Sequence, residues 1–146
     1  YLQERAFPTS IIIHLGTNDI FSDPTWVVRN RIAENLAGIR EMLPNTKIIW
    51  SDILPRLYYY GEMNPGAGRR SAHNFNAEGH RVVRRLGNGC VISHGGVFSA
   101  ATSNIFRIDG LHLSEEGIAA FHSNLAGALV FFNCNAHVTV YPPPQG

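Results

Sequence analysis

The chain has 146 residues, with little cysteine, little charge and no long apolar run. Its two cysteines, Cys90 and Cys134, are too few for a disulfide framework, and they form no C-x-x-C pair or metal-type spacing. No apolar stretch approaches the roughly 18 residues that a bilayer-spanning helix needs. We therefore predict reduced thiols and no membrane partner. Because no signal peptide is recognisable, an intracellular location is favoured.

Charge and histidine spacing exclude further classes. The net charge of +1 gives no reason to expect nucleic acid or an anionic membrane as an obligatory partner. The seven histidines include no H-x-x-x-H pair, so we predict no metal site. With 45% hydrophobic residues, the chain has the composition of a folded domain, which we place at residues 1–132, followed by a C-terminal tail at 133–146.

Apolar periodicity predicts alternating strands and helices. Runs at 11–15, 47–53 and 90–92 have the length and β-branched content of buried strands. Helices are predicted after an Asp23 N-cap, over 70–86, and after a Ser114 N-cap. The last helix is expected to face inward along Ile118, Phe121, Leu125 and Leu129. This order predicts an α/β fold, a parallel sheet with helices on both faces.

Two short polar segments fall where strands of such a sheet end. Gly16-Thr17-Asn18-Asp19 follows the first run, where Gly16 permits a sharp turn and the Asn18 amide can donate to a developing oxyanion. Alternatively, Asn and Asp here only end the strand and cap the next turn. Because ligands of open parallel sheets bind beyond the carboxyl ends of the strands, the segment is a candidate site.

The second segment, Asp109-Gly110-Leu111-His112, precedes the last helix. Across its glycine turn, the Asp109 carboxylate can reach Nδ1–H of His112, fix the ring tautomer and leave Nε2 as a general base. An ordinary turn with a surface histidine is the alternative. Two such segments in this order are more informative than either alone.

Together, these segments resemble two sequence blocks of the SGNH (GDSL-type) hydrolases, serine esterases with a flavodoxin-like fold. The segments 50–56, 84–87 and 106–114 are similar to SGNH domains carried by tyrosine-recombinase retrotransposons of vertebrate genomes. The resemblance covers roughly residues 10–130. It implies a three-layer, flavodoxin-like domain of retrotransposon origin.

The resemblance also implies a reaction and its residues. Carboxylic esters would be hydrolysed through an acyl-enzyme without metal or cofactor. Asn18, with Gly16, would bind the oxyanion, His112 would act as base and acid, and Asp109 would orient it.

The Gly-x-Ser block that should carry the nucleophile is absent. The chain starts at what corresponds to the third strand of that fold, as an N-terminally truncated domain would. Ser22, Ser51 and Ser93 lie near strand ends, but none follows the strand that should present the nucleophile. The nucleophile is therefore unknown, and we expect the chain alone to be inactive unless a serine-bearing segment completes it for a small ester substrate. A non-catalytic, transposon-derived binding or assembly module is the alternative.

Three further features bear on partners. Loss of a central strand would leave backbone groups at an open sheet edge, which predicts a homo-oligomer. Five arginines (Arg69, Arg70, Arg81, Arg84 and Arg85) make one helical region basic, which a solvated helix face explains more commonly than nucleic-acid binding. Tyr58-Tyr59-Tyr60 either lines an acyl pocket or packs its own loop.

Overall fold

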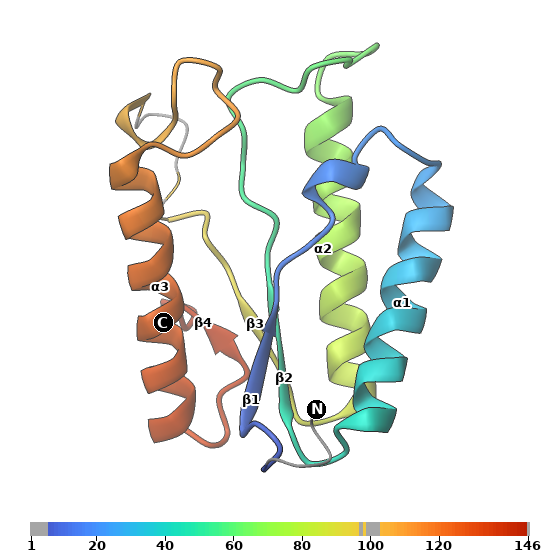
Figure 1. Ribbon diagram of the computed structural model, residues 1–146, viewed down its shortest axis with the longest axis vertical. Coiled ribbons are helices and arrows are strands. Elements are labelled where there is room, and N and C mark those ends of the chain that lie inside the picture. The colour runs from blue at the N-terminus through green and yellow to red at the C-terminus, as the bar shows by residue number, and fades with distance from the viewer. Residues whose placement is uncertain (1–5, 97, 99–102, 146) are drawn as a thin grey trace.

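A four-stranded parallel sheet forms the centre of the computed structural model, which describes residues 6–96, 98 and 103–145. Figure 1 shows the strands between the helices, and their order in the sheet is β1-β2-β3-β4. Their bounds are Ser10–Ile13 for β1, Lys47–Ser51 for β2, Gly89–Ile92 for β3 and Val140–Tyr141 for β4. The predicted α/β class with a parallel sheet is confirmed.

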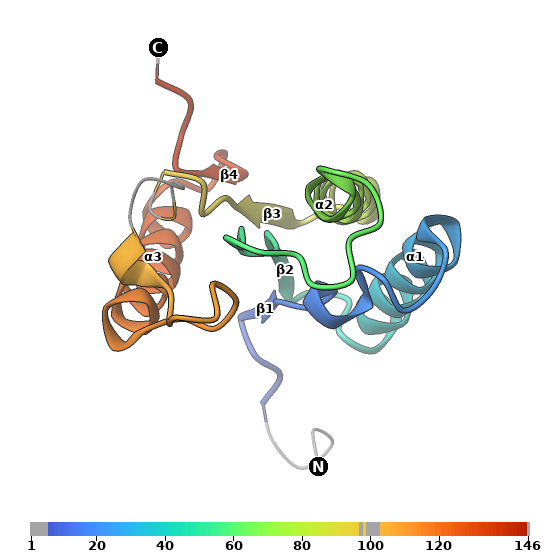
Figure 2. The same cartoon turned by 90° about the horizontal axis from the view of Figure 1, so that it is seen from above.

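Helices cover both faces of this sheet. The helices α1 (Thr25–Met42) and α2 (Ala67–Leu86) lie on one face, and α3 (Glu115–Cys134) lies on the other (Figure 2). Two short 3-10 turns, η2 (Thr17–Asp19) and η3 (Ser103–Ile105), lie in the loops. This three-layer arrangement is compatible with a flavodoxin-like fold.

The core has two halves because successive strand side chains point to opposite faces. Trp50 packs with Phe75 on the α1–α2 face, whereas its neighbour Ile49 packs with Phe132 of α3. Trp50 and Ile49 are both fully buried, as the continuous apolar run in β2 predicts.

The predicted start of the first helix was wrong, whereas that of the last was right. Pro24, not Asp23, is the N-cap of α1, and the Asp23 carboxylate instead pairs with Arg31 at 2.5 Å. Its oxygens are thereby occupied by a guanidinium rather than by backbone N–H groups. Ser114 caps α3 as predicted, because its hydroxyl accepts a hydrogen bond from the Gly117 N–H at 3.1 Å.

Three of the four predicted inward residues of α3, Phe121, Leu125 and Leu129, pack against the core, but the helix is turned so that they are not its deepest residues. Ile118 is 41% exposed, and Phe121 is only half-buried. The deepest residues are instead Gly117, Ala128 and Phe132. Gly117 fits against the Ile105 carbonyl, where a Cβ would lie 2.2 Å from the oxygen, so close contact with η3 sets the rotation.

Much of α3 is apolar yet remains exposed. Among the described helices, it is the one long and apolar enough to cross a membrane, a property that the search for uninterrupted apolar runs missed. Length and composition alone are weak evidence, since the core helix of a soluble protein passes the same test, although such a helix is mostly buried and only 17% of this apolar window is. Ala128 and Phe132 of α3 pack against the sheet.

The two edge strands of the sheet are β4, which lies in the predicted C-terminal tail, and β1. β4 lies inside the segment 133–146, and Tyr141 packs with Phe131 and Phe132 of α3. At the other edge, β1 pairs with β2, and no further described strand pairs with it. One side of β1 is therefore open.

Candidate functional site

Both polar segments singled out in the sequence lie on one groove of about 540 Å³. The groove lies beyond the carboxyl ends of β1 and β2, at the end of the sheet where ligands of open parallel folds bind. Its lining comes from three stretches of chain, residues 14–19, 54–56 and 111–113. Parallel pairing aligns the ends of β1 and β2 and so brings the first two stretches together, whereas residues 111–113 belong to the loop before α3.

Gly16 and Asn18 form one wall of the groove. Gly16 has a φ of 101°, a conformation that other residues rarely adopt, and its carbonyl accepts from the Asp19 N–H at 3.1 Å to close η2. Asn18 is exposed. Within the described part of the chain, no hydrogen bond engages its side-chain amide, which leaves this donor available to a ligand.

The opposite wall carries the Asp109–His112 pair. Asp109 Oδ2 lies 2.7 Å from His112 Nδ1, the contact that the three-residue spacing predicts. The second oxygen, Oδ1, accepts from the backbone N–H groups of Leu111 and His112 at 2.9 and 3.0 Å. These contacts, led by the one with His112, lower the pKa of Asp109 to about 2. An ionised Asp109 holds the His112 ring with Nδ1 protonated and Nε2 free as an acceptor.

The loop that holds this pair is fixed by its tyrosine neighbours. Gly110 has a φ of 65°, and a Cβ there would lie 2.2 Å from the Tyr58 ring. Its carbonyl accepts from the Leu57 N–H at 2.9 Å, and the Tyr60 hydroxyl donates to the Asp109 carbonyl at 2.6 Å. The position of the Asp109 carboxylate thus depends on the segment 57–60.

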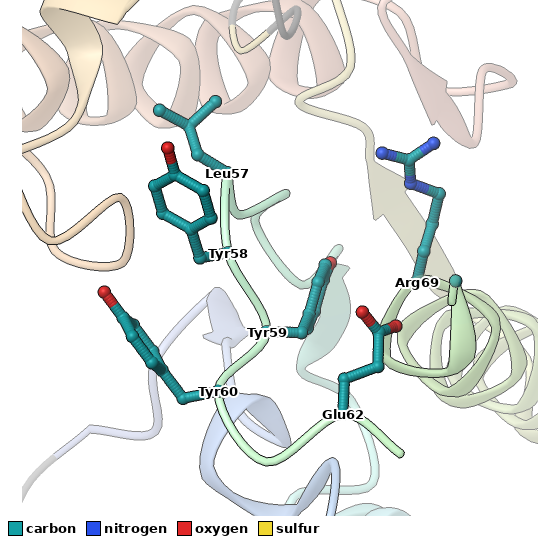
Figure 3. A pocket seen from close by; sticks show the side chains of 7 residues that line it. Leu57, Tyr58, Tyr59, Tyr60, Glu62 and Arg69 are labelled. Carbon is teal, nitrogen blue, oxygen red and sulfur yellow. The ribbon is translucent and has the colours of Figure 1, made fainter. Parts of the chain in front are cut away.

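The tyrosines also border a cavity of their own, of about 600 Å³ (Figure 3). Tyr58 and Tyr60 lie on one side of the segment, with ring centroids 6.4 Å apart, and Glu62 and Arg69 lie beyond Tyr59. Tyr59 is half-buried and packs against the core. Both roles considered for the tyrosines, lining a cavity and packing their own loop, are compatible with this placement.

Ser22 and Ser51, two of the serines considered as nucleophiles, have hydrogen-bond partners other than His112. Among the described residues, no serine hydroxyl makes a hydrogen bond with the His112 ring. Ser22 donates to the Asp19 carbonyl, and Ser51 is buried beside two other histidines. Neither serine is paired with His112.

A second polar cluster lies behind the groove, and sequence reasoning missed it. His14 Nδ1 lies 3.0 Å from Ser51 Oγ, which lies 2.7 Å from His94 Nε2. On its other side, His94 Nδ1 lies 2.8 Å from Asn124 Nδ2. Ser51 ends β2, and His14 and His94 follow β1 and β3, so position at a strand end was the available signal.

Burial makes these imidazoles weak bases. His94 is only 1% exposed, and burial, assisted by nearby His14, lowers its pKa to about 4. His14 is exposed as a residue, but partial burial of its ring lowers its pKa, against smaller opposing effects of the Ser51 backbone and the Asp52 charge. Both rings are therefore neutral at neutral pH.

Arg56 joins the strand-end loops to each other. Its guanidinium donates to the Thr17 carbonyl at 3.1 Å, which ties the loop after β2 to the segment 16–19 after β1. Partial burial lowers the pKa of Arg56. Arg56 lines the groove, where it is a positively charged neighbour for an anionic ligand group.

Metal ligation finds no support in the side chains described. Across residues 6–96, 98 and 103–145, no three His, Cys, Asp or Glu side chains gather closely enough to hold an ion. Cys90 is buried, with a raised pKa caused mainly by that burial, and Cys134 is exposed on α3.

The groove thus contains a free amide donor and a guanidinium from the loops after β1 and β2, and a carboxylate-oriented imidazole from the loop before α3. No protein-family model matches the chain, and no curated protein matches its sequence.

Proposed function

We propose that the groove is the oxyanion and acid–base half of a carboxylic ester hydrolase site of the SGNH type, on a flavodoxin-like domain. His112 is the base and acid, Asp109 orients it, and Asn18 with the Gly16 turn supplies the oxyanion donor. The observation that carries this proposal is the Asp109–His112 contact on the same groove as Asn18.

Each residue meets a requirement of acyl transfer. The tetrahedral intermediate places negative charge on the former carbonyl oxygen, and a fixed amide donor stabilises that charge. The nucleophile must lose a proton as it attacks, and Nε2 of His112 is the ring nitrogen left free to accept it. Asp109 stabilises the imidazolium that forms, as a carboxylate with a depressed pKa can do at neutral pH.

We infer that a serine from outside the described hydrogen-bond network must complete the site. Without it, hydrolysis by this chain should be weak, because oxyanion binding and a positioned base retain only part of the acceleration. The substrate class is a small ester whose acyl oxygen reaches Asn18.

Hydrolysis of 4-nitrophenyl acetate by the purified 146-residue chain tests this assignment. We expect a slow, saturable reaction above the buffer rate, and a decrease of about a hundredfold, or down to the buffer rate, in His112→Ala, because about a hundredfold is the low end of what a general base contributes. His137→Ala is the matched control, because His137 is an exposed histidine near the start of β4, away from the residues that line the groove. Equal rates for wild type and His112→Ala would overturn the assignment.

A second candidate function is a binding or assembly module. The open side of β1 and the exposed apolar residues of α3, such as Ile118 and Val130, favour it. Unpaired strand edges readily accept another strand, so a second copy of the chain is the partner that this candidate implies.

A further inference from the structure

A chain of hydrogen bonds links four segments behind the groove and ends at His14, a groove residue. We name Asn124, His94, Ser51 and His14 the relay. Its members come from α3, the loop after β3, the end of β2 and the loop after β1. Ser51 is fully buried and His94 is 1% exposed, so water has little access to the inner links.

The Asn124 amide fixes the direction of the first link. The same terminal atom lies 3.1 Å from the Ser93 carbonyl oxygen and 2.8 Å from His94 Nδ1. A carbonyl oxygen only accepts, so this atom is the NH₂ group and donates to both. His94 Nδ1 therefore carries no proton, and the neutral ring carries its proton on Nε2.

The remaining links follow in sequence. His94 Nε2–H donates to Ser51 Oγ at 2.7 Å. The hydroxyl proton of Ser51 then points away from His94, and His14 Nδ1, which lies 3.0 Å from Ser51 Oγ, is the acceptor that we assign to it. A neutral His14 whose Nδ1 accepts carries its own proton on Nε2.

We propose that His14 is a hydrogen-bond donor of the groove, held in its Nε2–H tautomer by the relay. It would bind an acceptor oxygen, such as the carbonyl of an acyl group or an oxygen of a carboxylate. The acyl ligand rests on the proposed function, whereas the tautomer of His14 does not. In this assignment Ser51 is a positioning residue, because His94 Nε2 already holds a proton and has no free lone pair for that of Ser51.

The tautomers can be measured directly by long-range ¹H–¹⁵N correlation spectra of the labelled chain at neutral pH. A protonated ring nitrogen resonates far upfield of an unprotonated (bare) one, so the spectrum of each ring reports which of its two nitrogens carries the proton. We expect protonated Nε2 and bare Nδ1 for both His14 and His94. A bare Nε2 on either ring would overturn the proposal.

Asn124→Asp separates the relay from an intrinsic preference of the His14 ring. A carboxylate can only accept from a neutral ring, so His94 should move its proton to Nδ1, Ser51 should donate to His94, and His14 should switch to Nδ1–H. The spectra are recorded at a pH above the pKa of both rings, and the ¹⁵N shifts themselves verify that both rings are neutral. A switch of His94 without one of His14 would contradict the relay.

Ser51→Ala provides a second variant with a different expected result. It removes the link to His14 but keeps Asn124, so His94 should stay Nε2–H while His14 shows both tautomers. Ser93→Ala is the matched control, because the Ser93 backbone carbonyl, not its hydroxyl, accepts from Asn124. A His14 ring that remains a single Nε2–H tautomer in Ser51→Ala would count against the relay.

Acetate probes the donor itself, independently of hydrolysis. We expect its addition to shift the His14 Nε2 resonance in a saturable way, and to do so more weakly in Asn124→Asp. An unchanged resonance would refute the donor role. The hydrolysis assay with His112→Ala can fail or succeed separately, because His112 is not part of the relay.

Discussion

His94 is a buried neutral imidazole, and this makes folding stability depend on pH in a defined window. Its folded pKa is about 4, lowered by burial and by His14 despite an opposing effect of Asp52, whereas an unfolded histidine titrates near about 6.5. The unfolded chain thus binds a proton first as the pH falls. The contribution is complete above about pH 6.5, decreases as the pH falls to about 4, and changes no further below that.

As the pH falls between those values, we expect the titration of His94 to lower the free energy of unfolding by about 3 kcal/mol. Each unit of difference between its unfolded and folded pKa corresponds to about 1.36 kcal/mol. Urea denaturation at a series of pH values measures it. His94→Gln, which keeps a neutral amide in place of the ring, should be less stable at neutral pH but should lose this slope. The prediction would be wrong if both proteins showed the same slope between about pH 6.5 and 5, above the range where Glu78 titrates.

Gly110 is the backbone position on which the Asp109 carboxylate depends. Gly110→Ala combines a φ of 65° with a Cβ that would lie 2.2 Å from the Tyr58 ring. We expect a loss of about 1–3 kcal/mol in the free energy of unfolding, the usual range for backbone strain and overpacking. Gly38→Ala in α1 is the control, because nothing lies within 4 Å of its Cβ, and helix propensity should make it stabilising.

At the scale of elements, the Ser114 cap joins α3 to η3. Its hydroxyl accepts from the Gly117 N–H and donates to the Asn104 carbonyl at 2.5 Å. Ser114→Ala should lower the free energy of unfolding by about 1 kcal/mol, as cap removal does. Ser123→Ala, at an exposed position inside the same helix, should change it by less than about 0.5 kcal/mol in thermal or urea unfolding. Equal effects of the two variants would show that the cap is unimportant.

Local signals explain why the element types and the inward faces of α1 and α2 were predictable, whereas the inward face of α3 was predictable only in part. Strand and helix types follow from apolar period and caps, which act over a few residues. The inward face of α3 depends on contact of Gly117 with Ile105 and of Phe132 with the sheet, partners far away in the sequence. The periodicity of α3 alone could not select them, because the helix is apolar around most of its circumference.

At the scale of the whole molecule, β4 has an uncommon connection. The crossovers through α1 and α2 place both helices on one face of the sheet, whereas α3 lies on the other face before β4 adds beside β3 (Figure 2). With the strand order advancing in one direction throughout, the third crossover has the opposite hand to the first two. Parallel crossovers are right-handed in about 98% of cases. A parallel strand beside β3, reached through a helix on the opposite face, is therefore an arrangement that general rules do not lead one to expect from the sequence.

The open side of β1 predicts self-association. The Lys47 N–H donates to the Thr9 carbonyl, and alternate residues of a parallel strand bond to the same neighbour. Ser10 and Ile12 therefore direct their backbone groups to the open side. We expect the chain to form dimers or larger species at micromolar concentration, measured by light scattering after size exclusion.

Ser10→Pro tests the edge itself, because it removes one outward N–H without touching the pairing with β2. We expect the assembly to dissociate several-fold more readily while far-ultraviolet circular dichroism stays unchanged. Thr9→Ala is the control, since it keeps every backbone donor of the edge. A strictly monomeric wild type, or assembly unaffected by Ser10→Pro, would refute this interface.

The sequence by itself determined the alternation of strands and helices up to α3, the Ser114 cap and the Asp109–His112 contact, because each depends on residues close together in the chain. It did not indicate β4. Only the tertiary structure decided the shared groove and the relay. Register is the reason: Ile13 pairs with Trp50, and Ser51 pairs with Ile92, so His14 and His94 both lie beside Ser51. Such neighbours are set by strand pairing and by the packing of α3 on the sheet, which no local pattern records.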